Sequence, residues 1–473
     1  MSDNDSRFAA FTRYGKKQLG WLFNTSTFTG NLVISGIAVY FFRQLGYGDA
    51  VDYVFFVSLL AIGLWITEAI PPFAVGILII GMMLLGFGTE FILDETSDVE
   101  VYVDTWTSNV IWLLLGGFFL AEGMRVAHLD KSLFAFTLKR FGTHPRKLLF
   151  GLMLTTAIGS MVISNTATTA MMLGSVLPLV TQLGKAHPMS KALLIGIPAA
   201  ATLGGIGTII GSTPNAIAAG ALQEVGVAIS FLDWMLFGIP AAIILLYIYY
   251  RFLVRQLPVD INAYEVDWQS LTVVNRSRIR NRRAVLITLV ITILLWMTEK
   301  LHGVPAAATS AVPIVLLTLT QVITAKDVRN VPWETLMLVA GGLALGIAIV
   351  DVGLARIAMD ALMSLSIWPI GLLIIFAYLA GIVSNVMSNT AAAAILVPLG
   401  ISLAGIYGLA APVVIAISCS SALMFPVSTP SNAISFATGL IDQKEFRNGG
   451  LLMALLSPVV GIGVAMLWAW AFN

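Results

Sequence analysis

Charged side chains are scarce in this chain of 473 residues. Asp, Glu, Lys and Arg make up 11% of it, whereas soluble domains carry about 25%. Hydrophobic residues account for 58% of the sequence, and the mean hydropathy is +0.91. Apolar stretches long enough to cross a bilayer recur along the chain. The composition therefore predicts a polytopic all-α membrane protein embedded in a lipid bilayer.

Cysteine and histidine are also rare. The single cysteine, Cys419, has no partner for an intramolecular disulfide, and the four histidines are scattered. We therefore expect no transition-metal site. The apolar runs do not alternate in polarity, which excludes a membrane β-barrel. The chain has no His-Glu-x-x-His and no Gly-x-Ser-x-Gly motif, which argues against a membrane-embedded hydrolase. We expect neither an enzyme nor a nucleic-acid partner.

What the sequence does contain is a doubled polar motif in apolar surroundings. Ser-Asn-Thr occurs at 164–166 and at 388–390, and each copy has a serine four residues earlier, Ser160 and Ser384. Each copy is followed by a second cluster of small polar residues, at 211–215 and 428–432. Hydrogen bonding between membrane helices would explain one isolated copy. The duplication favours a binding site to which both halves of the chain contribute.

Internal repetition extends beyond this motif. The segment 64–68 (LWITE) is echoed by 295–299 (LWMTE), Gly116-Gly117 by Gly341-Gly342, and the first Ser-Asn-Thr by the second, at offsets of 231, 225 and 224. The segment before the first copy is strongly basic, whereas its counterpart before the second is nearly uncharged. The two halves are therefore expected to enter the membrane from opposite sides, as an inverted repeat.

The basic segments also set the predicted orientation. They should face the cytoplasm, which places the N-terminus inside and the C-terminus outside the plasma (inner) membrane. We expect about 11 transmembrane helices. The predicted parts are a cytoplasmic amphipathic segment at 1–29, a first repeat at 30–250 with scaffold helices at 30–124 and a re-entrant hairpin and broken helix at 148–228, a basic connection at 251–283, and a second repeat at 284–473 with scaffold helices at 284–352, a hairpin and broken helix at 372–440 and a last helix at 450–472.

The four polar clusters are expected to converge. Proline in the second cluster of each half should break the helix there, exposing carbonyls from one half-helix and amides from the next. Carbonyl and hydroxyl oxygens suit a cation such as sodium, whereas helix N-termini suit an anion. No arginine lies near the motifs in sequence. The charge of an anionic ligand should therefore be offset by helix dipoles, neutral donors and bound cations.

Three carboxylates, Glu68, Glu122 and Glu299, lie nearest to the membrane interior. An intramembrane carboxylate is a candidate functional group, but each of these lies near the end of an apolar span. Structural anchoring is the simpler interpretation, and a role with a proton or an ion is the alternative. The glycines at 205, 207 and 211 do not have the spacing of a dinucleotide fingerprint.

With these motifs the chain resembles the divalent-anion/sodium symporters, which include bacterial dicarboxylate transporters and animal citrate and dicarboxylate carriers. In that family each Ser-Asn-Thr caps a re-entrant hairpin. The resemblance implies Na⁺ as the coupling ion and no other cofactor. The implied sodium ligands are Ser160, Ser164, Asn165 and Gly211 at one site and Ser384, Ser388, Asn389 and Ser428 at the other. The implied substrate ligands are Asn165, Thr166, Ser212, Asn389, Thr390 and Thr429. Thr213 departs from the family pattern, which has proline beside the serine.

The expected function is secondary active import of small di- or tricarboxylates by sodium symport, with C4-dicarboxylates such as succinate, malate and fumarate as the leading substrates. The resemblance also implies a homodimer with an elevator mechanism. Three alternatives stay open: a sodium-independent dicarboxylate or citrate exchanger, a symporter of an inorganic dianion such as sulfate, and a passive channel.

Overall fold

The computed structural model describes residues 24–90, 93, 98–257, 279–364, 369–407 and 410–472. All regular secondary structure in these residues is helical, which confirms the prediction of an all-α chain. Most of the predicted N-terminal amphipathic segment and of the basic connection lies outside the described residues. Their proposed places at the membrane surface stay predictions.

Seven helices of the described residues are long and apolar enough to cross a membrane: Asn24–Leu45, Asp49–Thr67 (α2), Glu100–Val126, Asn165–Leu183 (α8), Phe231–Gln256 (α11), Trp333–Asp351 (α18) and Lys444–Trp468. Shorter apolar helices lie between them. The chain is therefore an integral membrane protein. The expected total of about 11 membrane helices stays a prediction, because the shorter and broken helices do not reach spanning length alone.

The remaining helices have the following bounds: α3 Pro72–Phe87, α4 Glu100–Asp104, α5 Asn109–Val126, α6 Leu129–Phe141, α7 Pro145–Ser160, α9 Pro188–Gly205, α10 Thr213–Glu224, α13 Ile279–Met297, α14 Glu299–His302, α15 Ala306–Thr309, α16 Ala311–Leu319, α17 Ala325–Val328, α19 Leu354–Met363, α20 Pro369–Val386, α21 Asn389–Tyr407, α22 Ala410–Ser420, α23 Pro430–Ala437 and α24 Lys444–Phe472. Two short 3₁₀ helices, Arg43–Leu45 and Thr105–Thr107, complete the set.

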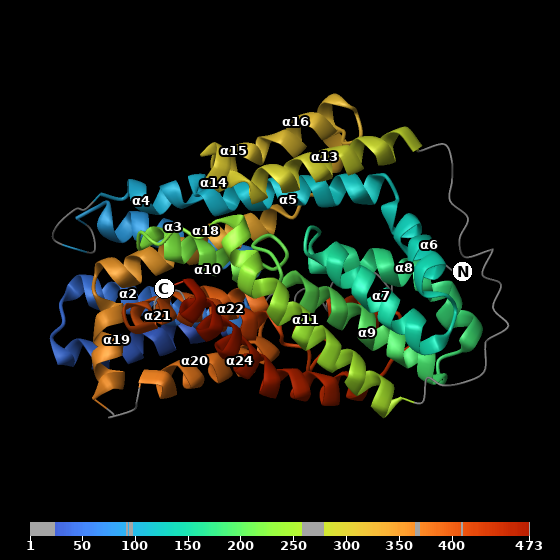
Figure 1. Cartoon of the computed structure of the whole chain (residues 1–473). Helices are drawn as coiled ribbons and strands as arrows, with labels where there is room; N and C mark the ends of the chain where they lie inside the picture. The colour runs from blue at the N-terminus through green and yellow to red at the C-terminus, as the bar shows by residue number, and fades with distance from the viewer. Residues whose placement is uncertain are drawn as a thin grey trace, which may run out of the picture.

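The helices form two packed groups (Figure 1). In the first, which we call the frame, α3 packs against α18, and α5 packs against α13, α15 and α16. The second, which we call the tip group, contains α7–α11 and α20–α24, with α7 packed on α9, α20 on α22 and α11 on α24. The two groups meet where α18 of the frame contacts α10 and α21.

The repeated glycine pairs lie where these contacts are closest. A Cβ atom added to Gly341 on α18 would lie 2.2 Å from the Cα atom of Gly76 on α3, so this position requires glycine for packing within the frame. A Cβ atom added to the next residue, Gly342, would lie 3.0 Å from the Cβ atom of Ala394 on α21. The two glycines of the pair therefore face the two different groups.

The equivalent pair on α5 has the same division. A Cβ atom added to Gly116 would lie 2.7 Å from the Cβ atom of Ser310, within the frame, and one added to Gly117 would lie 3.2 Å from the Cδ1 atom of Ile210, in the tip group. The repeat seen in the sequence thus places a smooth surface on each of two frame helices, against the group that carries the polar motifs.

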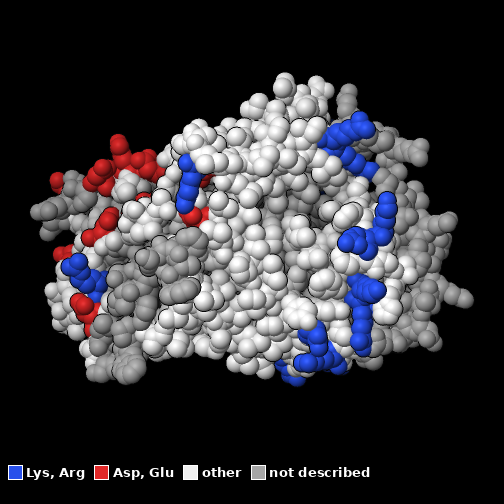
Figure 2. Space-filling view, viewed as in Figure 1, with Lys and Arg blue, Asp and Glu red and all other residues white. Residues whose placement is uncertain are grey.

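Charge is separated between the two ends of the molecule. Figure 2 shows Asp and Glu gathered at the end where α4 lies, and Lys and Arg gathered at the opposite end, over the region of α6 and the start of α7. We refer to these as the acidic end and the basic end. The α5 helix runs from the acidic to the basic end and carries Arg125 in its last turn.

Candidate functional site

The polar motifs of both halves line one central cavity of about 750 Å³. All six predicted substrate ligands line it, as do Ser164, Gly211 and Ser388 of the predicted sodium ligands. Ser160, Ser384 and Ser428 lie behind this wall and are fully buried. The cavity is also lined by residues of α3, α5, α18 and the segment that leads into α18, which include Phe73, Phe118, Glu122, Arg125, Asn330 and Glu334.

Four helices of the tip group begin at this cavity. The first residues of α8, α10, α21 and α23 are Asn165, Thr213, Asn389 and Pro430, and all four line the cavity. The amide end of each helix carries a partial positive charge, so convergent N-termini favour a bound anion. Two of the helices start after the predicted breaks, where α9 ends at Gly205 and α22 ends at Ser420.

The first Ser-Asn-Thr forms the joint between α7 and α8. Ser164 accepts a hydrogen bond from the backbone N–H of Ala167, 3.3 Å away, and so caps α8. Ser160 is the last residue of α7, and its Oγ atom lies 2.6 Å from the end of the Asn165 side chain. The serine four residues before the motif therefore meets the asparagine of the motif.

Several oxygens converge on the Asn165 amide. If its oxygen faces Ser160, it faces only acceptors. In the opposite orientation the amide nitrogen donates to Ser160 Oγ at 2.6 Å, to the carbonyl of Ala201 at 2.9 Å and to the carbonyl of Gly211 at 3.0 Å. We assign this second orientation because it satisfies every group. The three oxygens are of the kind that a hard cation takes as ligands, and in this orientation the amide nitrogen occupies the point between them.

Glycine makes this convergence possible. A Cβ atom added to Gly205 would lie 2.3 Å from the end of the Asn165 side-chain amide and 2.6 Å from the carbonyl oxygen of Gly211. Any side chain at position 205 would therefore fill the space between the helix break and the hairpin tip. The glycines at 205 and 211, whose spacing does not fit a dinucleotide-binding motif, are thus needed for close packing at the helix break.

The second half repeats this arrangement. Ser384 Oγ lies 2.9 Å from Asn389 Oδ1 and 2.7 Å from the carbonyl oxygen of Cys419, and Ser388 caps α21 by accepting from the N–H of Ala391 at 3.2 Å. The Cys419 carbonyl accepts from the serine of the second half, whereas the Ala201 carbonyl accepts from the asparagine of the first. Neither carbonyl is predictable from the motifs, because a backbone oxygen leaves no residue-type signal in a sequence.

Two further asparagines hold the helix breaks. The Nδ2 atom of Asn215 donates to the carbonyls of Gly205 at 2.9 Å and Thr208 at 2.8 Å, and that of Asn432 donates to the carbonyl of Leu423 at 3.1 Å. Both asparagines are buried. They satisfy carbonyls that the broken helices leave without helical partners.

Three predicted ligands also have partners within the protein. Ser212 Oγ lies 2.8 Å from Ser420 Oγ and so joins the two helix breaks. Thr429 accepts from the N–H of Asn432 at 3.1 Å and caps α23. Ser428 donates through its hydroxyl to the carbonyl of Asn385 at 2.9 Å. Thr166 and Thr390 lie at the cavity wall and are more open.

The cavity is not free of charged side chains. We expected no arginine to pair with a substrate carboxylate at the tips, but Arg125 on α5 does line the cavity that contains them, together with Glu122 and Glu334. The frame supplies this wall, and its helices lie far from the motifs in sequence. Glu68 and Glu299 do not line the central cavity. The described residues contain no cluster of three His, Cys, Asp or Glu side chains arranged to hold a metal ion.

The sequence of this chain matches that of a known transporter family. A sequence profile of the citrate transporter family matches residues 62–420. The sodium-dependent dicarboxylate transporter SdcS of Staphylococcus aureus strain USA300 is 30% identical over 450 residues, which cover 86% of this chain and 84% of that protein. The same transporter from strain MW2 is 31% identical with the same coverage.

Two solved structures share the fold. They are MtrF of Neisseria gonorrhoeae, described as one of a class of antimetabolite efflux pumps, with a TM-score of 0.52, and the YdaH transporter of Alcanivorax borkumensis, with a TM-score of 0.54. Each is 14% identical in sequence, and each comparison covers 85% of this chain and 96% or 99% of the other. At this identity the likeness concerns the fold alone.

Proposed function

Because the chain belongs to the divalent-anion/sodium symporter family, we propose that it imports small di- or tricarboxylates together with sodium. Membership of this family makes the chain a membrane transporter and not an enzyme. C4-dicarboxylates such as succinate, malate and fumarate are the leading substrates. The name of the S. aureus relatives supports both the dicarboxylate and the sodium dependence. Import places the protein in the plasma (inner) membrane.

One observation supports this proposal: oxygens suited to a cation and helix N-termini suited to an anion lie at or directly behind the wall of one cavity. The oxygens around Asn165 and around Ser384 suit sodium. The N-termini of four helices suit carboxylates. Each hairpin tip then holds one sodium ion and one end of the dianion, with Asn165 and Asn389 serving both. A carboxylate bound beside sodium gains from the ion's charge, and this mutual stabilisation couples the two ligands.

An elevator movement of the tip group against the frame completes the proposed mechanism. The support is the pair of contacts at Gly117 and Gly342, where the frame helices present no side chain of their own to Ile210 and Ala394 of the tip group. A homodimer through the frame would hold the frame still during this movement. The basic end faces the cytoplasm in this proposal, because positively charged loops stay on that side.

The decisive experiment is uptake of radiolabelled succinate into proteoliposomes, with external sodium, external potassium and internal succinate varied in turn. We expect a sodium gradient to drive accumulation against the succinate gradient. Uptake that does not depend on sodium but requires internal dicarboxylate would indicate an exchanger. Equilibration without accumulation would indicate a channel, and sodium-driven uptake of sulfate in place of succinate would indicate an inorganic-dianion symporter.

A further inference from the structure

The charged wall of the central cavity is built as a rigid cluster. Arg125 Nε donates to Glu122 Oε2 at 2.7 Å, and Arg125 Nη2 donates to Glu122 Oε1, so the carboxylate binds one edge of the guanidinium in a bidentate pair. Asn330 Nδ2 donates to Glu122 Oε1 at 3.2 Å. Only 6% of the Glu122 side chain is exposed, whereas 49% of the Arg125 side chain is. The buried Glu122, which Asn330 holds in turn, therefore fixes Arg125 along one edge.

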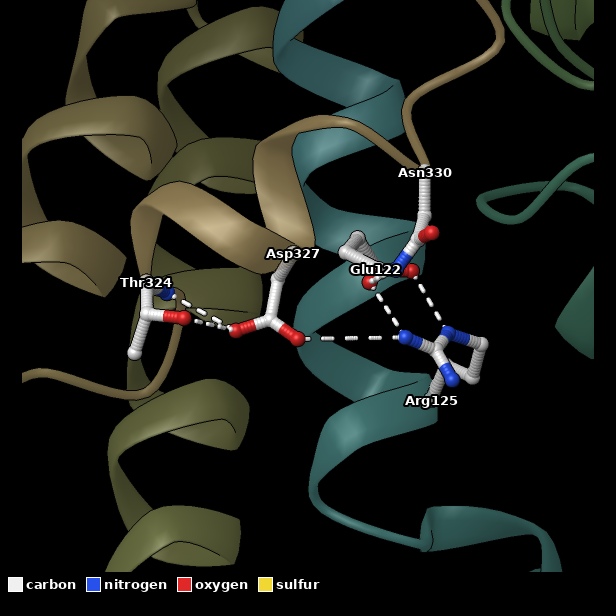
Figure 3. Close-up of polar contacts among 5 residues, drawn as sticks. All are labelled: Glu122, Arg125, Thr324, Asp327 and Asn330. Carbon is white, nitrogen blue, oxygen red and sulfur yellow. Dashed lines mark hydrogen bonds and ion pairs between the residues drawn. The ribbon is translucent and has the colours of Figure 1, made fainter.

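The second edge of the Arg125 guanidinium is open. Its Nη1 atom has no hydrogen-bond partner among the described residues, and the nearest other carboxylate is that of Asp327, whose Oδ1 atom lies 3.9 Å from Arg125 Nη2. Figure 3 shows the guanidinium between Glu122 on one side and Asp327 on the other, with one nitrogen unengaged. This edge offers two parallel N–H groups, the arrangement that binds a carboxylate.

Asp327 does not need Arg125 as a partner. It accepts hydrogen bonds at Oδ2 from the backbone N–H of Thr324 at 2.9 Å and from the Thr324 hydroxyl at 2.7 Å, in the capping box of α17. These bonds, led by the one from the Thr324 side chain, lower the pKa of the Asp327 carboxyl below its ordinary value. At 3.9 Å this carboxylate competes with a ligand for the open edge without occupying it.

We propose that Arg125 is a further carboxylate-binding group, used before the dianion reaches the tips or after it leaves them: its open guanidinium edge receives one carboxylate of the substrate at the basic end of the central cavity. Arg125 lines the same cavity as both tips but belongs to the frame. It is the only basic side chain among the described residues that line the cavity. This inference rests on the proposed transport of dicarboxylates.

The position of Arg125 makes this subsite accessible first to substrate that comes from one side of the membrane. It lies in the last turn of α5, toward the basic end. A dianion that enters or leaves by that end meets Arg125 on the frame, and one that enters from the acidic end meets the tips first. Arg125 should therefore affect the apparent affinity on one side of the membrane only. Glu122 and Asn330 act through Arg125 as positioning residues.

The test measures half-saturation for succinate separately on the two faces, in inside-out and right-side-out membrane vesicles. Arg125→Gln is expected to raise half-saturation on the basic face about tenfold, the change that corresponds to about 1.4 kcal/mol, and to leave the acidic face unchanged. Arg125→Lys keeps the positive charge but lacks the two parallel N–H groups of the guanidinium, so its affinity should lie between those of Arg125→Gln and the wild type. Asp327→Asn removes the competing carboxylate and should lower half-saturation on the basic face.

Arg329→Gln is the matched control, because it removes one positive charge from an exposed residue of the same region that does not line the cavity. If Arg125→Gln changes both faces equally, or no more than Arg329→Gln does, the inference is wrong. If Arg125→Gln keeps the wild-type level of uptake at the acidic face, the variant folds. Failure of wild-type vesicles to transport succinate at all would refute the proposed function and this inference with it, whereas transport without sidedness refutes only the inference.

Discussion

Replacing Asn165 by alanine should weaken sodium binding and so raise the sodium concentration that transport requires. The side-chain amide lies at the centre of three oxygens, 2.6, 2.9 and 3.0 Å away. When the amide turns its oxygen to a cation, alanine removes one ligand from that cation. If a contact between a neutral oxygen and the cation contributes as much as a hydrogen bond to a charged group, about 1.5–3 kcal/mol, the half-saturation for sodium should rise by about 10- to 150-fold.

The assay is sodium-dependent succinate uptake in proteoliposomes, with thermal unfolding of the purified protein measured beside it. Loss of the amide also leaves the carbonyls of Ala201 and Gly211 without this donor, which should lower stability by about 1–3 kcal/mol. Asn31→Ala is the matched control. Asn31 also donates through its amide, to Thr67 Oγ1 at 2.9 Å, but it does not line the cavity.

Asn165→Asp separates the two proposed roles of this residue. A carboxylate keeps an oxygen for the cation and adds negative charge, so sodium should bind at least as well as in the wild type. The same charge repels the substrate, so succinate should bind more weakly. Near wild-type sodium dependence in Asn165→Ala, or equal loss of both ligands in Asn165→Asp, would refute the assignment of Asn165 to both sites.

Three further results are expected. Asn389→Ala should raise the sodium half-saturation as well, because the second tip repeats the first, and an unchanged value in the same uptake assay would confine sodium to one tip. Gly342→Val should abolish transport while sodium-dependent succinate binding persists, since its side chain would enter the 3.0 Å contact with Ala394; active transport by this variant would count against a sliding interface. The uptake ratio of wild type to Asp327→Asn should stay constant from about pH 8 down to about pH 5. The hydrogen bond from Thr324 lowers the pKa of this carboxyl, so its charge persists above that value and is lost only as the pH falls through it; a ratio that changes near pH 6 would contradict this.

Much of the site could be predicted from side chains that repeat. The doubled serines and asparagines mark both tips, and the proline clusters mark both helix breaks. The structure brings the six predicted substrate ligands to one cavity. The helix ends at Gly205 and Ser420 agree with the breaks inferred from Pro214 and Pro430.

The remaining features could not be predicted, for two physical reasons. The Ala201 and Cys419 carbonyls belong to the backbone. Every residue type supplies the same backbone oxygen, so the sequence does not reveal which of these oxygens point toward the tips. Arg125 reaches the cavity through the packing of α5 against the tip group, so its distance in sequence conceals its place in space. Its i,i+3 pairing with Glu122 looks in sequence like an ordinary surface ion pair.

The four helix ends at the cavity bear on how such a protein can diversify. Because main-chain amides supply this positive potential, single substitutions of side chains leave it in place. The surrounding threonines, serines and Arg125 can then change without abolishing the capacity to hold an anion. After gene duplication, substitutions at these few side chains could therefore change the substrate, while the main-chain amides kept the positive potential that holds an anion.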